Sequence, residues 1–528
     1  MVRTPQDTSA EEPDGGNLHV RIRRGPGPGN QPGLLNSGYG RGGVPSDARL
    51  PRALLAGLPV LLALLIAWMC IGEIVEAGIK APPLLGLHTV VFFVFMLSAS
   101  ALTGSVLARR KPGTVIERGT VVLDEAPPET SAEPGALTLA GHPIALADET
   151  KHFKIIGTTG AGKSTAIREL LAGALGRGDR AVIADPDGDY LQRFYDPARG
   201  DIILNPFDER SARWDLFAEI TVPQDAEQLA RSVIPDYDGK DHIWTGFART
   251  YVSSILRQLH RLEERNLAKL YHLLVQATEA ELRDLLQGTP AARFIGKEGG
   301  KFLESVQSVT NQHLGVIEDV ARQSEDDLLS IRRWIREGRG VLFLPYSANE
   351  IASLQTLIST WMRLAIFETL SGPVGDQRIW FVIDELGALG PVDGLKDALT
   401  RLRKFGGRVI LGLQSIGQVR GPYGEAVSQS ITENCGNTMV LRSSSSEHGG
   451  TAEFASRLIG KRQITRQQHS ISRPSGHFFQ KTRTTTEQVF TEDAVMASEI
   501  EQLPDLKGFL KRVSKPYWQR VTLVPDAR

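Results

Sequence analysis

A glycine-rich run of eight residues constrains the fold of this chain more than any other feature. It reads Gly157-Thr158-Thr159-Gly160-Ala161-Gly162-Lys163-Ser164 and fits the pattern G-x-x-x-x-G-K-[ST]. A mainly apolar run at 153–156 precedes it, and a helix-like segment at 166–174 follows it. A phosphate-binding loop requires this strand, loop and helix context, so we predict a nucleoside triphosphate site in an α/β fold. An incidental glycine-rich turn is the alternative.

The chemistry of such a loop assigns a role to most of its residues. Glycines let the backbone curl so that its N–H groups and a helix N-terminus face the β-phosphate. We expect Lys163 to reach the β- and γ-phosphate oxygens and to act in catalysis, and Ser164 to hold Mg²⁺. The expected ligands are therefore ATP and Mg²⁺. The predicted nucleotide-binding residues are Gly157, Thr158, Thr159, Gly160, Ala161, Gly162, Lys163, Ser164 and Thr165.

A second motif lies more than two hundred residues downstream. The continuous apolar run at 379–383 is typical of a strand covered on both faces, and it ends in Asp384 and Glu385. This is the pattern of a Walker B strand. We predict that Asp384 holds Mg²⁺, directly or through water, and that Glu385 is the general base that polarises the attacking water. An exposed acidic strand end is the alternative.

Two further strands are expected to end near the same site. The segment 408–413 predicts a buried strand followed by Gln414, whose amide could contact the γ-phosphate or its water and report hydrolysis. A solvated turn residue is the other interpretation of Gln414. The segment 180–184 predicts a parallel strand ending in Asp185, which either faces the nucleotide or the next subunit, or is a structural acid of the turn.

Length, charge and cysteine content set outer limits. At 528 residues the chain exceeds one ordinary domain, and its formal net charge of −1 neither argues for nucleic acid binding nor excludes it. The two cysteines, Cys70 and Cys435, lie in no metal-binding pattern, so we predict neither a metal cluster nor a disulfide framework.

Two uncharged segments near the N-terminus have the length of membrane spans. We predict helices at about 53–71 and 84–107, with arginines before the first and after the second. By the positive-inside tendency both termini are then cytoplasmic, in a multi-pass membrane protein. A hairpin of two buried soluble helices is the alternative. Residues 1–50 are rich in glycine, proline and charge and predict a disordered cytoplasmic tail.

The remaining chain divides by its periodicity. We predict a transmembrane hairpin at 51–110, a β prelude and the first part of the nucleotide-binding domain at 111–221, and an all-α insertion at 222–337. The second part of the nucleotide-binding domain follows at 338–528. Within it, the polar segment 461–486 predicts an exposed hairpin or arm, and 518–523 a terminal strand after a turn at 503–508.

Four segments taken together resemble the type IV secretion coupling proteins of the TrwB/TraD kind, within the FtsK/HerA group of motor ATPases. They are 157–164, Ala184-Asp185-Pro186-Asp187-Gly188-Asp189, Val382-Ile383-Asp384-Glu385-Leu386 and Gly412-Leu413-Gln414-Ser415. The resemblance runs from the first predicted span to near residue 525. It implies a RecA-like P-loop NTPase domain with an all-α inserted domain and an N-terminal two-helix membrane anchor.

The function that this resemblance implies is a homohexameric ATPase at the cytoplasmic face of the bacterial inner membrane. Such a protein recruits relaxase-bound DNA, single- or double-stranded, and passes it to the type IV secretion channel by ATP hydrolysis. The resemblance also implies that Lys163, Glu385 and Gln414 serve catalysis, and that Arg403 is an arginine finger acting on the neighbouring subunit. Arg401 and Lys404 are neighbours that could substitute for Arg403.

Three other classes of protein compete with this interpretation. A membrane-anchored docking ATPase that hands over effector proteins without pumping DNA fits the near-neutral charge. An FtsK-like chromosome translocase shares the motor but usually carries more spans and a C-terminal DNA-reading domain, which the sequence does not show. An ABC transporter ATPase requires an LSGGQ-like signature, and the segment 370–375 does not fit it.

Overall fold

The computed structural model describes residues 115–124, 135–234, 242–296, 300–324, 327–392, 394–446, 449–472 and 482–525. The predicted tail, both predicted spans and Cys70 lie outside these ranges. Within them, no helix has both the length and the hydropathy of a membrane-spanning segment.

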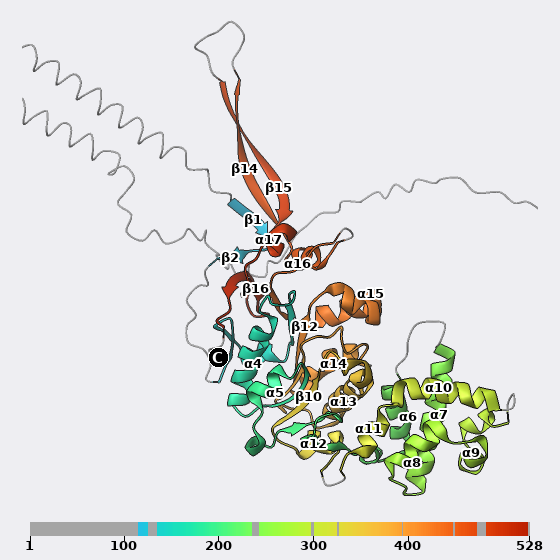
Figure 1. Cartoon of the computed structure of the whole chain (residues 1–528). Helices are drawn as coiled ribbons and strands as arrows, with labels where there is room; N and C mark the ends of the chain where they lie inside the picture. The colour runs from blue at the N-terminus through green and yellow to red at the C-terminus, as the bar shows by residue number, and fades with distance from the viewer. Residues whose placement is uncertain are drawn as a thin grey trace, which may run out of the picture. The chain divides into compact units, whose positions relative to one another are not determined.

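A ten-stranded sheet forms the centre of the described part of the chain (Figure 1). Seven neighbouring strands, from β13 to β7, run parallel, whereas β16 runs antiparallel to both β13 and β17. In spatial order the strands are β2 (Val122–Leu123), β17 (Trp518–Thr522), β16 (Lys507–Lys511), β13 (Asn437–Val440), β5 (Phe153–Ile156), β12 (Gly407–Leu413), β11 (Ile379–Ile383), β6 (Arg180–Pro186), β10 (Val341–Tyr346) and β7 (Ile202–Ile203).

Alternate residues of each parallel strand enter two separate hydrophobic cores, because successive side chains of a strand point to opposite faces. In β6, Ala181 and Ile183 belong to the core that contains helix α4 (Lys163–Gly176). Val182 and Ala184 belong to the other core, which contains helix α13 (Ile351–Ser371). Both faces of the sheet are therefore covered, which explains why the sequence of these strands is predominantly apolar.

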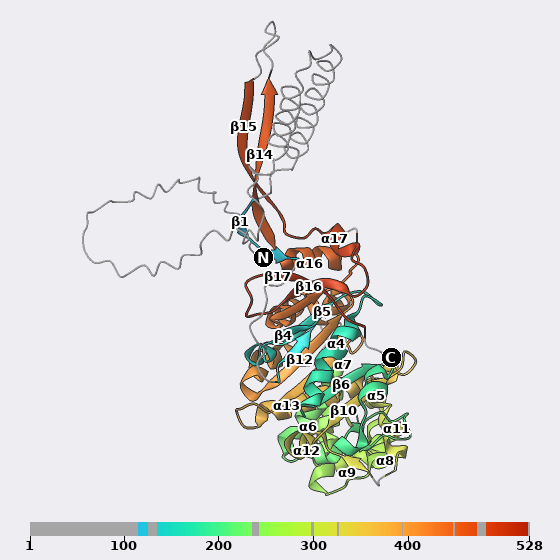
Figure 2. The same cartoon turned by 90° about the vertical axis from the view of Figure 1, so that its left-hand side faces the viewer.

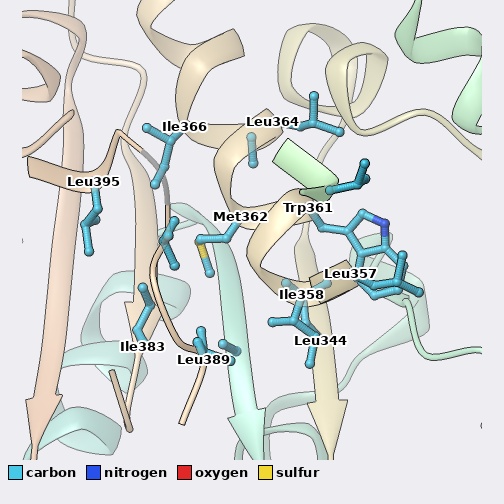
Figure 3. Packing of buried hydrophobic residues seen from close by; sticks show 14 of the residues in the cluster. Leu344, Leu357, Ile358, Trp361, Met362, Leu364, Ile366, Ile383, Leu389 and Leu395 are labelled. Atoms are coloured by element: carbon cyan, nitrogen blue, oxygen red, sulfur yellow. The ribbon is translucent and has the colours of Figure 1, made fainter. Parts of the chain in front are cut away.

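Helix α13 supplies much of the packing on its face of the sheet. Figure 3 shows Ile358, Trp361 and Met362 of this helix beside Leu344 of β10 and Ile383 of β11. All five side chains are fully buried. This contact fixes the strand that carries the acidic pair against a rigid helix.

A helical segment separates β7 from β10 and corresponds to the predicted insertion (Figure 1). Its helices are α6 (Pro223–Val233), α7 (His242–Arg261), α8 (Leu267–Tyr271), α9 (Glu279–Leu286), α10 (Lys301–Leu314), α11 (Ile317–Arg322) and α12 (Ile331–Glu337). The segment is not purely helical, because the short strand β9 (Leu328–Leu329) lies inside it and pairs with β8 (Arg213–Trp214). Thr360 of α13 donates a hydrogen bond of 3.0 Å to the Ser232 carbonyl of α6 and so joins the insertion to the sheet domain.

The predicted arm at 461–486 is a β-hairpin. Its strands β14 (Lys461–Ser472) and β15 (Thr482–Asp493) form a long twisted ribbon (Figure 2), and β14 also pairs with β1 (Val115–Gly119). A second, small hairpin consists of β3 (Leu137–Leu139) and β4 (His142–Ile144).

The remaining helices connect strands of the sheet or precede the terminal strands. They are α3 (Leu146–Glu149), α5 (Asp189–Phe194), α14 (Leu395–Arg401), α15 (Ile416–Asn434), α16 (Thr451–Ile459) and α17 (Ala497–Glu501). A further strand departs from the sequence-based prediction: β16 begins at Lys507, where a turn is expected. The turn is shorter than predicted because the following residues pair with β13 and β17.

Candidate nucleotide site

The glycine-rich run forms a loop between β5 and α4, at the carboxyl end of the sheet. Gly160 and Gly162 have φ angles of +77° and +111°, a backbone region that favours glycine. A Cβ atom on Gly162 would lie 2.9 Å from Leu506 Cδ2, and one on Gly157 would lie 2.9 Å from Leu441 Cβ. Both backbone conformation and close packing therefore require glycine in this loop.

The loop is also fastened to its neighbours by hydrogen bonds. The backbone N–H and the hydroxyl of Thr158 both donate to the Arg442 carbonyl, at 2.9 and 3.2 Å. The Leu506 N–H donates to the Ala161 carbonyl at 3.0 Å. The N-terminus of the 14-residue helix α4, which begins at Lys163, follows directly. Such an end leaves N–H groups free for an anion.

The carboxylate of Asp384 lies at the centre of the site. Its side chain is buried, and its Oδ2 accepts hydrogen bonds from Ser164 Oγ at 2.8 Å and from Tyr190 Oη at 2.7 Å. Lys163 Nζ lies 3.5 Å from Oδ1. Lys163, Ser164 and Asp384 thus converge although the sequence separates the loop from the acidic pair.

The other carboxylate oxygen provides a test of whether a metal fits here. Asp384 Oδ1 is buried and accepts no hydrogen bond from the described residues. Its charge is balanced by Lys163 Nζ at 3.5 Å, but none of those residues donates a hydrogen bond to its lone pairs. Hard cations such as Mg²⁺ prefer carboxylate and hydroxyl oxygens, so Ser164 and Asp384 fit the predicted ion.

Glu385 follows Asp384 and is half-buried. Burial raises the pKa of the Tyr346 hydroxyl, and the negative charges of Glu385 and Asp384 raise it further. That hydroxyl is buried at the carboxyl end of β10 and has no hydrogen-bond partner among the described residues. Glu385 therefore lies at the same edge of the sheet as the loop, where a general base for water would have to be.

Gln414 lies at the end of β12, which is the strand between β5 and β11. Its amide Nε2 donates to the Thr159 hydroxyl of the phosphate loop. A side chain in this position connects the loop to the helix that follows β12, as the sensor interpretation requires.

The structure separates Arg403 from this group. Arg403 is exposed in a 3₁₀ turn, Leu402–Phe405, that precedes β12, whereas Gln414 follows the strand. Seven residues of strand at about 3.3 Å each span roughly 20 Å, so Arg403 cannot reach the loop of its own subunit. Arg401 and Lys404 are exposed at the same edge.

Asp185 and Tyr190 complete the description. Asp185 is buried and accepts hydrogen bonds from the backbone N–H groups of Tyr190 at 3.1 Å and Leu191 at 2.7 Å, which favours the structural interpretation. Burial raises its pKa to about 7. Sequence analysis did not single out Tyr190. The only hint of a role for Tyr190 is that it follows β6, the strand that neighbours the Walker B strand.

Comparison with known proteins is decisive for the family. Residues 136–524 match the family model described as the type IV secretion-system coupling protein DNA-binding domain. This chain belongs to the type IV secretion-system coupling proteins. The resemblance predicted from the sequence motifs is therefore confirmed.

Two curated relatives show the extent of the similarity. The coupling protein TraD of Escherichia coli (strain K12) is 32% identical over 399 residues, which are 73% of this chain and 55% of TraD. The coupling protein VirD4 of Bartonella quintana (strain Toulouse) is 28% identical over 191 residues, which are 33% of this chain and 29% of VirD4. The chain thus spans about half the length of TraD and less of VirD4.

Solved structures of the conjugative coupling protein TrwB resemble the described fold. The unbound form, TrwBdeltaN70, has a TM-score of 0.68 at 30% identity, covering 79% of this chain and 95% of the solved chain. TrwB in complex with ADP and Mg²⁺ has a TM-score of 0.67 at 31% identity, with the same coverage of 79% and 95%. TrwB has also been solved with a non-hydrolysable ATP analogue. The fold is accordingly RecA-like, an α/β nucleotide-binding fold with an inserted helical domain.

Proposed function

We propose that this protein is a coupling ATPase of a type IV secretion or conjugation system, which binds DNA and drives its transfer to the secretion channel by ATP hydrolysis. The convergence of Lys163, Ser164 and Asp384 at the end of a glycine loop is the observation that carries the proposal. The complexes of TrwB with ADP and Mg²⁺ and with an ATP analogue support the same ligands here.

The residues of the site divide the chemistry of hydrolysis among them. Backbone N–H groups of the loop and Lys163 bind the phosphates, and Ser164 and Asp384 hold Mg²⁺, which neutralises charge on the phosphate oxygens. Glu385 orients the attacking water and accepts its proton. Gln414 transmits the state of the loop to the chain that follows β12, through its hydrogen bond to Thr159.

Arg403 acts in trans in this proposal. Its distance from its own loop means that any contact with a γ-phosphate comes from a second copy of the chain. A guanidinium placed there stabilises charge that develops in the transition state. In a closed ring, every interface joins the same two different surfaces of neighbouring subunits, which fits the proposed homohexamer.

DNA is the proposed substrate because the matching family model is that of a DNA-binding domain. The relaxosome and the channel are the proposed partners. The chief alternative is a docking ATPase for effector proteins. Binding of single- and double-stranded DNA at several salt concentrations distinguishes the two, because phosphate neutralisation gives a steep salt dependence. No binding at any salt concentration would favour the docking ATPase.

Anchoring in the inner membrane by the predicted spans at 53–71 and 84–107 is part of the proposal. Extraction of membranes at alkaline pH releases peripheral proteins and retains proteins with spanning helices. Removal of residues 1–110 should move the protein to the soluble fraction. Retention of the truncated protein in the membrane would contradict the assignment.

Replacement of the loop lysine tests the enzyme itself. Lys163→Ala should reduce DNA-stimulated ATP hydrolysis to background and abolish plasmid transfer, because the phosphates lose their cationic ligand. The measurements are phosphate release and mating frequency. Lys301→Ala is the control: Lys301 is exposed in helix α10 and has no role in the site, so its variant should release phosphate at the wild-type rate. Hydrolysis at the wild-type rate by Lys163→Ala would refute the assignment of the site.

A further inference from the structure

Tyr190 links the magnesium carboxylate to a neighbouring strand. It lies in the short helix α5, which follows β6, and its side chain is fully buried. Its hydroxyl donates to Asp384 Oδ2 at 2.7 Å across a sequence separation of 194 residues. The ring packs in the core that contains α4, so the position of the hydroxyl is fixed by its surroundings.

The backbone around Tyr190 is held by a second carboxylate. Asp185, at the end of β6, accepts hydrogen bonds from the N–H groups of Tyr190 and Leu191 at 3.1 and 2.7 Å. These bonds satisfy N–H groups at the start of α5 that the helix leaves free. Because β6 pairs with β11 in the sheet, the segment from Asp185 to Tyr190 begins at a fixed position beside Asp384.

The two oxygens of Asp384 differ in their surroundings. Oδ2 accepts from both Ser164 and Tyr190, whereas Oδ1 is buried without a hydrogen bond. Two donors on one oxygen restrain rotation of the carboxylate and keep the other oxygen directed toward Lys163, whose Nζ is 3.5 Å away. This oxygen, which has an ion pair but no hydrogen bond from the described residues, is the position at which a cation would bind.

We propose that Tyr190 is a positioning residue for the magnesium site, which fixes the orientation of Asp384 through its hydroxyl. The inference rests on the proposed binding of ATP and Mg²⁺. Ser164 shares this restraint, because its hydroxyl can donate to Oδ2 while a lone pair of the same oxygen binds the cation. The Tyr190 hydroxyl has no second role assigned to it and restrains the carboxylate independently of the cation. Partners of metal ligands in other proteins contribute about 10–100-fold to metal affinity, which sets the expected scale.

Replacement of Tyr190 by phenylalanine removes only the hydroxyl and leaves the ring. Binding of a fluorescent ADP analogue is measured by titration with Mg²⁺ and, separately, in excess EDTA, on the full chain in detergent. Tyr190→Phe should raise the half-saturating Mg²⁺ concentration about tenfold and leave nucleotide affinity in EDTA unchanged. Loss of a merely structural contact would weaken binding in EDTA as well.

Tyr195→Phe is the matched control. Tyr195 follows the same helix and packs edge-on against Phe343 of β10, with ring centroids 6.2 Å apart. Its variant should bind Mg²⁺ and nucleotide as the wild type does. An unchanged Mg²⁺ titration for Tyr190→Phe, or an equal effect of both variants, would overturn the inference. Wild-type protein whose nucleotide binding shows no dependence on Mg²⁺ would instead overturn the proposed function.

Asp185→Asn provides a second test. Asparagine keeps the size of the side chain but loses one of the two acceptors that hold α5. The variant should raise the half-saturating Mg²⁺ concentration in the same direction as Tyr190→Phe. An Asp185→Asn protein that folds and matches the wild type would show that the anchoring of α5 does not position Tyr190.

Discussion

Gly412 lies in β12 at the point where this strand passes Asp384. A Cβ atom on Gly412 would overlap the main-chain carbonyl oxygen of Asp384 and lie 2.6 Å from its carbonyl carbon. It would also lie 2.8 Å from Oδ1, the oxygen proposed to face the cation. Only glycine, which has no Cβ atom, therefore leaves room for Asp384 beside position 412. Gly412→Ala should displace the acidic pair.

The size of the effect follows from the atoms involved. The obstacle is the backbone of Asp384, which directly follows the fully buried strand β11, so it cannot move aside as a flexible side chain would. Overpacking of a core costs about 1–3 kcal/mol, and a clash with backbone belongs at the upper end of that range. In a large domain about 3 kcal/mol lowers the midpoint of thermal unfolding by several degrees. Mg²⁺-dependent nucleotide binding should weaken by at least tenfold, since Asp384 moves.

Thermal unfolding and the Mg²⁺ titration of nucleotide binding measure the two effects. Gly246→Ala is the matched control, because a Cβ at Gly246 in helix α7 meets no atom within 4 Å. Alanine in a helix interior is favoured over glycine by about 0.5–1 kcal/mol, so this control should stabilise the protein. If Gly412→Ala unfolds at the wild-type temperature and binds Mg²⁺-nucleotide normally, then the close approach of β12 to Asp384 is not what the site depends on.

The remaining predictions concern assembly and pH. Arg403→Ala and Glu385→Gln subunits should each be inactive alone, and mixtures should recover ATP hydrolysis because an intact Arg403 meets an intact Glu385 at some interfaces. No recovery at any mixing ratio would remove the support for a finger in trans. Glu219 is buried, and burial raises its pKa to about 7 despite hydrogen bonds from Ile331, Arg332 and Trp214. Between pH 4.5 and about 7 the carboxyl is protonated in the folded protein and ionised in the unfolded chain. The stability that it contributes at low pH is therefore lost as the pH rises through this range. Denaturant unfolding of Glu219→Gln should therefore show a gain over wild type that grows by up to about 3 kcal/mol from pH 5 to pH 8. A constant difference would contradict the raised pKa.

Sequence patterns located the elements whose signal is local. The strand expected at 379–383 is β11, because a strand buried on both faces is typically apolar without interruption. The mainly apolar run at 153–156 is β5. The loop between β5 and α4 could be predicted because its glycines are required by backbone conformation. Helical periodicity likewise located the insertion, apart from the pair of residues in β9.

Other features depend on contacts between residues far apart in the chain. The hydrogen bond of Tyr190 to Asp384 spans 194 residues, and a tyrosine after a turn has no local pattern that distinguishes it. The pairing of β16 with β13 and β17 decided that Lys507 begins a strand. The sequence left two roles open for Asp185, and its two backbone hydrogen bonds favour the structural one.

The sequence by itself determined the phosphate loop and the acidic strand end, because each is encoded in consecutive residues, and it determined the family through the combination of four such motifs. Tertiary structure alone decided that Ser164 and Tyr190 share one oxygen of Asp384 while Arg403 lies at the opposite edge of the sheet. The physical reason is that strand order, and not sequence distance, sets which side chains meet at the carboxyl end of a parallel sheet.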